Sequence, residues 1–144
     1  MRTRLILLFL SMLTGVLIHA QDLSVIGNPG GTASAISLSK LSSYFKGEIK
    51  TWDNGSKVVL ALMKSNTAPG VSTCGKVFQM SCDAVTKFWL GKAMESNTAA
   101  PVFFNSVGEL QAFVKSKPGA IGIIDLSPPV AGVRVIQIDG KNSF

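Results

Sequence analysis

Few side chains in this 144-residue chain could do chemistry. It has one histidine, His19, two cysteines, Cys74 and Cys82, and eight acidic residues. A Ser-His-Asp or Cys-His site needs a histidine, and His19 lies in a segment that we expect to be removed. Two cysteines are too few for a four-thiolate zinc site. A carboxylate pair of the glycosidase type stays open, although no spacing of the acids singles one out.

We therefore expect no catalytic residues, no metal and no cofactor. The expected removal of His19 depends on residues 1–20, which have the pattern of a secretory signal peptide. Two arginines in the first four residues precede an apolar run, Leu5–Ile18, and the small residue Ala20 ends the segment. The run is short for a membrane span. We expect cleavage, a periplasmic protein without a membrane span, and one domain over residues 21–144; a retained anchor is the alternative.

The charge of the remaining chain is mildly basic. Of the 14 Lys and Arg residues, two lie in the first 20 positions, so 12 face 8 Asp and Glu, a net charge of +4. The lysines are scattered singly, whereas a nucleic-acid-binding stripe would be clustered and interleaved with aromatic residues. The pattern indicates a solvated surface that attracts small anions weakly and binds no nucleic acid.

Cys74 and Cys82 are predicted to form a disulfide, because they are the only cysteines of a protein that we expect in an oxidising compartment. One continuous helix from 74 to 82 would hold them about 12 Å apart, which is too far for a bridge. We therefore expect the chain to break near Met80–Ser81, so that two helical pieces fold back on each other. Two buried free thiols are the alternative.

Apolar segments alternate with helical patterns along the chain. Strands are expected at residues 23–26, 58–63, 120–124 and 133–138, and helices after the capping residues Ser37, Ser81 and Ser106. Residues 64–75 have the composition of a loop, with a short helical turn expected over 76–80. The alternation of strands and helices predicts a layered α/β domain.

Three stretches in this order resemble a known family: "LSKLSSYFKGEIKTWDNGSKVVLALMK", "VTKFWLGKAM" and "SVGELQAFVKSKPGAIGIID". Together they are similar to the substrate-binding proteins of phosphate ABC importers, in the type II periplasmic-binding-protein superfamily, over residues 22–138. The resemblance implies a mostly parallel sheet flanked by helices. Family members that hold phosphate have two lobes and about twice this length, so this chain would form a single lobe.

The resemblance also bears on Trp52, which stands between two turn-like sequences. It occupies a matching position between a helix end and a strand, which favours a core tryptophan that closes one edge of the scaffold. The alternative is a stacking platform for a sugar or base. A sugar site would offer several aromatic residues, and few lie outside the predicted helical faces.

An anion site is implied at residues Ser72, Thr73, Cys74, Gly75 and Lys76. The family commonly carries Ser-Gly-Thr-Arg at a helix N-terminus, where N–H groups, hydroxyls and the arginine hold the anion. The matching stretch here keeps hydroxyls and a positive charge but lacks the arginine fork. We expect it to open a helix and to bind phosphate or sulfate no better than about millimolar, roughly −4 kcal/mol.

Two functions of different classes follow. The first is an exported solute-binding-like protein, related to the substrate-binding proteins of phosphate importers, with at most a weak oxyanion site. The second is a single-lobe interaction or sensor-accessory module that binds an envelope protein rather than a solute. For the first function, a protein partner or a homodimer could supply the wall that a single lobe lacks and so tighten anion binding.

Overall fold

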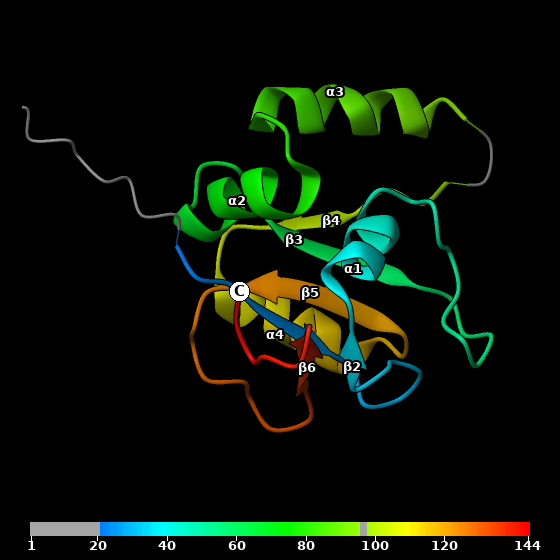
Figure 1. Cartoon of the computed structure of the whole chain (residues 1–144), viewed down its shortest axis with the longest axis vertical. Coiled ribbons are helices and arrows are strands. Elements are labelled where there is room, and N and C mark those ends of the chain that lie inside the picture. The colour runs from blue at the N-terminus through cyan, green and yellow to red at the C-terminus, as the bar shows by residue number, and fades with distance from the viewer. Residues whose placement is uncertain (1–20, 96–97) are drawn as a thin grey trace, which may run out of the picture.

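A six-stranded sheet forms the centre of the structure, a computed structural model that describes residues 21–95 and 98–144 (Figure 1). Its strands are β1 (Ser24–Gly27), β2 (Ala35–Ile36), β3 (Val59–Met63), β4 (Val102–Phe104), β5 (Ala120–Ile124) and β6 (Arg134–Ile138). They lie in the order β2-β6-β1-β5-β3-β4. Strand β1 pairs antiparallel with β5 and β6, whereas the other pairings are parallel. The predicted mostly parallel α/β sheet is confirmed; the predicted signal peptide lies outside the described residues.

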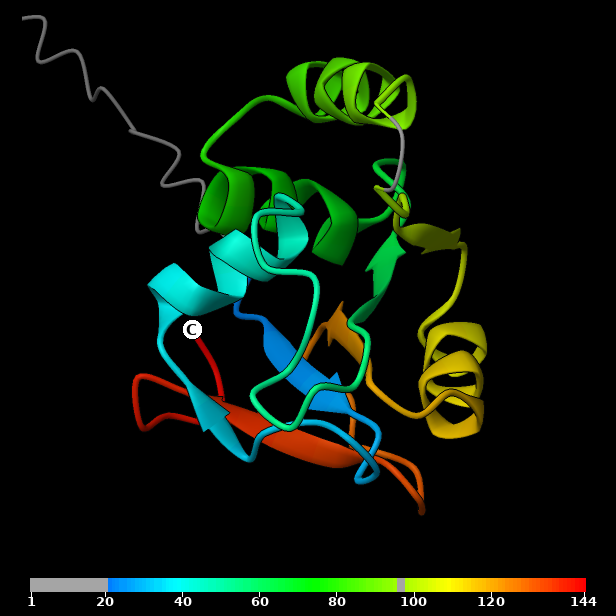
Figure 2. The same ribbon diagram turned by 90° about the vertical axis from the view of Figure 1, so that its right-hand side faces the viewer.

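The helical segments are α1 (Leu38–Phe45), α2 (Ala68–Thr73), the π-helical η1 (Cys74–Phe78), α3 (Cys82–Ala93) and α4 (Val107–Ser116). The three predicted capping serines are confirmed, because the hydroxyls of Ser37, Ser81 and Ser106 each accept a hydrogen bond from the N–H three residues on. Helix α4 covers one face of the sheet, and α1 with η1 covers the other (Figure 2). Helix α3 lies beyond η1 on that second side.

The central strands bury side chains on both faces. On β3, Leu60 and Leu62 belong to the core under α1 and η1, whereas Ala61 and Met63 belong to the core under α4. Strand β5 divides its residues in the same way, because successive side chains of a strand point to opposite faces. This explains why both strands are apolar throughout, which is typical of parallel strands that are covered on both faces.

The prediction that residues 64–75 form a loop is wrong. Thr67 caps α2, since its hydroxyl accepts a hydrogen bond from the Gly70 N–H at 3.1 Å. Pro69 fits the first turn, where its missing N–H costs nothing, and Gly70 is required because a Cβ there would lie 2.0 Å from the Lys64 carbonyl oxygen. Helix α2 runs directly into η1. Residues 72–76 therefore do not open a helix, and that expectation is corrected.

Trp52 is a scaffold residue, as predicted. Its side chain is only 3% exposed, its Nε1–H donates to the Gly119 carbonyl at 2.9 Å, and its ring lies 4.7 Å from that of Tyr44. Burial raises the pKa of Tyr44. On the surface beside it, a hydrogen bond to the Asp53 carboxylate raises the pKa of Lys40. A buried indole with these contacts has no free face on which a sugar or base could stack.

Gly119 joins three loops at the amino ends of β3 and β5. Its N–H donates to the Gly30 carbonyl, and its own carbonyl accepts from the Trp52 indole and from the Val59 N–H. Its φ of +79° is in the left-handed region, and a Cβ would lie 2.2 Å from the Lys57 carbonyl oxygen. Only glycine satisfies both constraints.

We expect Gly119→Ala to destabilise the protein far more than Gly55→Ala, its matched control. Gly55 has a similar φ of +85°, but nothing lies within 4 Å of a Cβ built there, so its substitution should cost about 1 kcal/mol. Gly119→Ala adds a backbone clash, so we expect it to lose at least about 2 kcal/mol more unfolding free energy than Gly55→Ala. Urea denaturation of both variants measures the difference. Equal losses would show that the Lys57 loop moves aside freely.

Candidate functional site

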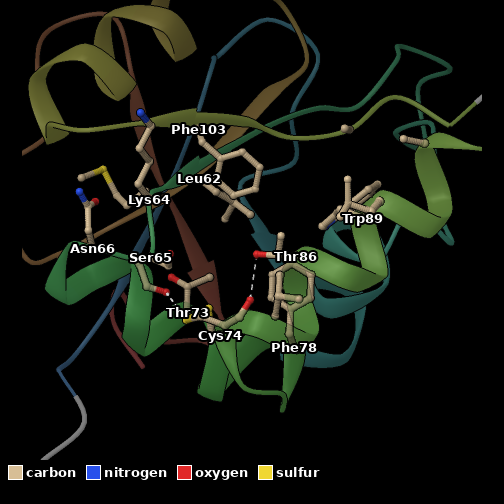
Figure 3. A pocket seen from close by; sticks show the side chains of 17 residues that line it. Leu62, Lys64, Ser65, Asn66, Thr73, Cys74, Phe78, Thr86, Trp89 and Phe103 are labelled. Atoms are coloured by element: carbon tan, nitrogen blue, oxygen red, sulfur yellow. Dashed lines mark hydrogen bonds between the residues drawn. A yellow bond between two sulfur atoms is a disulfide. The ribbon is translucent and has the colours of Figure 1, made fainter.

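A cavity of about 520 Å³ lies at the carboxyl end of β3, between β3, β4 and α3 (Figure 3). Leu62 and Phe103 from the strands and Trp89 from α3 line it with apolar surface. Lys64, Ser65 and Asn66, which follow β3, form a polar end. Among the described residues that line the cavity, Lys64 is the only charged one. The cavity is thus apolar along its length and basic at one end.

A disulfide holds the start of α3 beside this cavity. Cys74 and Cys82 are bonded, with their Cα atoms 5.3 Å apart. The chain reverses between them at Gln79, whose φ is +54°, so η1 and α3 fold back on each other. The predicted disulfide and the predicted break before α3 are both confirmed. Both cysteines also line the cavity, so the bridge is part of its wall.

Helix α3 contributes one buried and one exposed apolar side chain to the wall of the cavity. Trp89 is buried and packs toward α1, where its ring would lie 3.3 Å from a Cβ built on Gly47. Leu90, the next residue, lines the cavity and remains 63% exposed. On the opposite side Phe103 is 42% exposed. The mouth of the cavity is therefore bordered by apolar side chains that contact water.

The structure does not gather the five predicted anion-binding residues around one space. Thr73 and Cys74 line the cavity, but the Thr73 hydroxyl donates to the Pro69 carbonyl at 2.8 Å and Cys74 is in the disulfide. Ser72 and Gly75 are not among the lining residues. Lys76 bonds elsewhere: its Nζ donates to the Phe144 carbonyl oxygen at 2.9 Å and lies 3.7 Å from an Asp22 carboxylate oxygen. Anion binding by this stretch stays a prediction.

The polar end formed by Lys64, Ser65 and Asn66 was missed by the sequence analysis. Its signal was a buried strand followed by short polar residues and by Thr67, a helix-capping type, one residue before Ala68–Pro69. The start of α2 adds few free donors. Pro69 has no N–H, and the Gly70 N–H is taken by the Thr67 hydroxyl. The Lys64 amine is therefore the main attraction for an anion here.

A second, polar hollow of about 440 Å³ lies between α1 and η1. It contains Lys46, Lys76 and several serines, which makes it a competing place for an anion. However, Lys76 already bonds the Phe144 carbonyl, and the Ser42 hydroxyl donates to the Val77 carbonyl at 2.9 Å. Glu48 also borders the hollow and would repel an anion. None of the described residues that line the cavity beside Lys64 is acidic.

Residues 21–95 and 98–144 contain no group of three or more His, Cys, Asp or Glu side chains that could hold a metal ion. None of the helices in them is long and apolar enough to cross a membrane.

We expect the Cys74→Ser/Cys82→Ser double variant to lose about 2–3 kcal/mol of unfolding free energy, because the short loop is no longer closed in the unfolded chain. Amide hydrogen exchange should rise most in α3, whose start the bridge holds. A reductant should produce the same changes in the wild type and none in the double variant. Unchanged exchange in α3 would show that the packing of Val85 and Trp89 is enough to position the helix without the disulfide.

Of the comparisons with known proteins, the one with solved structures finds proteins of similar fold. No family model and no curated protein matches the chain. Among solved structures it is similar to an ABC-type phosphate transport receptor from Vibrio cholerae, with a TM-score of 0.66, 16% identity, and coverage of 85% of this chain and 48% of that one. It is also similar to a putative phosphate ABC transporter substrate-binding protein with bound phosphate from Clostridium perfringens. The TM-score is 0.65 and the identity 14%, over 83% of this chain and 46% of that one.

PstS from Borrelia burgdorferi is similar with a TM-score of 0.58 and 17% identity, over 83% of this chain and 48% of that one. In each case the chain spans about half the length of the protein that it matches. The expected likeness in fold and the expected single lobe are thus confirmed. The chain has the periplasmic-binding-protein-like fold of about half of a phosphate-importer substrate-binding protein.

Proposed function

We propose that this chain is an exported binding protein that takes a small oxyanion, phosphate or sulfate, weakly at the Lys64 end of the cavity. The observation that carries the proposal is the position of the cavity. It includes the residues that directly follow the carboxyl end of β3, the end of a strand at which open α/β sheets take their ligands, and Lys64 is the one charged residue among the described residues that line it. The anion class comes from the solved proteins of similar fold, which are described as phosphate transport receptors.

Export and a non-catalytic role belong to the same proposal. The Cys74–Cys82 disulfide is compatible with an oxidising compartment. Residues 21–144 contain no histidine, which leaves them without the general base of the common hydrolase sites. The proteins of similar fold are described as transport receptors or substrate-binding proteins, and a binding role agrees with that.

The binding should be weak for two physical reasons. Lys64 is exposed, so water competes for its amine and salt screens its charge. A single lobe also leaves the anion open to solvent, and the start of α2 supplies few free N–H donors. We expect a dissociation constant of about 1 mM or above, which corresponds to roughly −4 kcal/mol.

A second function, an interaction module that binds a protein, is favoured by one observation. The cavity is lined mostly by apolar side chains, Leu62, Phe78, Trp89 and Phe103 among them, and a free inorganic anion gains nothing from such walls. Its mouth is bordered by exposed Leu90 and Phe103. A cavity of this kind suits a ligand with apolar groups.

Titration of the exported protein with phosphate and with sulfate, followed by ¹⁵N NMR at low salt, tests the oxyanion site. We expect shifts at residues 64–68 that saturate at millimolar concentration and disappear in Lys64→Gln. Lys76→Gln is the matched variant and should keep them. Loss of binding in Lys76→Gln instead would place the anion at residues 72–76. Micromolar affinity of a monomer would contradict the argument that one lobe binds weakly.

A further inference from the structure

We propose that the cavity and the open edge of β4 form one docking groove for the extended, apolar C-terminal tail of a partner protein. The tail's terminal carboxylate is then the oxyanion that Lys64 binds. The inference rests on the proposed function because it uses the same Lys64 end of the cavity. Three features of the described residues carry it: an unpaired strand edge, an apolar cavity beside that edge, and a single cation at one end.

Strand β4 ends the sheet and pairs only with β3 among the described strands. The Phe104 carbonyl accepts a hydrogen bond from the Lys64 N–H at 2.9 Å, so the backbone groups of Phe104 point toward β3. Successive residues of a strand direct these groups to opposite sides, and those of Phe103 therefore point to the open edge. Val102 and Phe103 are each 42% exposed. An apolar edge of this kind is a template for an added strand.

The cavity lies on the face of the sheet to which Phe103 contributes its side chain (Figure 3). Alternate side chains of an added strand point to the same face. Every second side chain of a chain paired with β4 would thus reach the space between Phe103 and α3, where Leu90 is exposed. Pairing with the edge and filling the cavity are compatible with one extended peptide.

The charge sets the direction of that peptide. Lys64 directly follows β3, so its position is at the carboxyl end of β3 and of the parallel strand β4. Trp89 lies at the other side of the cavity (Figure 3). No described lining residue is acidic, and a carboxylate near Lys64 meets no like charge there. A peptide whose C-terminus meets Lys64 runs parallel to β4.

Two other candidate occupants would use fewer of these three features. A fatty acid would use the apolar cavity and Lys64 but would leave the outward backbone groups of Phe103 unpaired. The segment at Phe144 of a second copy is already bound within its own chain, because the Phe144 N–H and carbonyl pair with Leu23 and the carbonyl also accepts from Lys76. A partner's tail uses all three features without disrupting either chain.

The test uses octapeptides with free carboxyl termini, their last four positions randomised over Val, Ile, Leu, Phe, Ser and Thr, selected on the exported protein. We expect apolar residues at alternating positions and a dissociation constant of about 10–100 µM for the selected sequence. Its C-terminal amide should bind about tenfold more weakly. N-methylation of the amide that faces Phe103 should weaken binding without any change to the protein.

Variants locate the peptide in the groove. Lys64→Gln should lower the affinity of the free acid about tenfold, to that of the amide, and leave the amide unaffected. Leu90→Asp should weaken both peptides. Leu126→Asp is its matched control, because Leu126 is similarly exposed, at 58%, and does not line the cavity.

The outcomes separate this inference from the proposed function. Failure to select a peptide, while phosphate still binds in a Lys64-dependent way, overturns the inference and leaves the proposed function standing. Failure of both ligands overturns both. Equal affinity of the acid and amide peptides would show that the groove does not bind the terminal carboxylate. Saturable, Lys64-dependent binding of decanoate without peptide binding would assign the cavity to a small amphiphile instead.

Discussion

The hydrogen bonds of Gly119 are the constraint on which the rest of the structure depends. They join the loop at Gly30, the indole of Trp52 and the start of β3 around one peptide unit that only glycine can provide. Because these contacts close the amino ends of β3 and β5, the two parallel strands begin in a fixed register. The cavity forms at the opposite, carboxyl end of β3.

The placement of α3 then decides the character of that cavity. The left-handed residue Gln79 reverses the chain after η1, and the Cys74–Cys82 bridge fixes the reversal. The helix buries Val85 and Trp89 but leaves Leu90 exposed at the mouth. A helix packed closer to β4 would cover Phe103 and remove the cavity. The cost of the present arrangement is apolar surface in water, which a ligand or partner can offset by covering it.

Much of the scaffold could be predicted, because its signals are local. Apolar runs indicated the central strands, serine caps marked α1, α3 and α4, and the chain reversal needed by the cysteine pair indicated the break before α3. The errors came from residues whose roles depend on distant contacts. The Pro69-Gly70 pair is typical of a loop, whereas here glycine is required inside a helix because the Lys64 carbonyl leaves no room for a Cβ at Gly70. The edge strand β4, and with it the groove, depends on pairing that three residues cannot specify.

The energetics of the cavity favour a peptide over a free anion. One solvent-exposed contact between Lys64 and an anion contributes about 1 kcal/mol or less. Each 40 Å² of apolar surface removed from water contributes about the same, and a few side chains placed against Leu62, Trp89 and Phe103 would cover several times that area. Lys64 would then orient a ligand whose affinity comes mainly from the apolar walls. A lobe that has no second half to enclose an anion can in this way still hold a ligand that brings its own apolar surface.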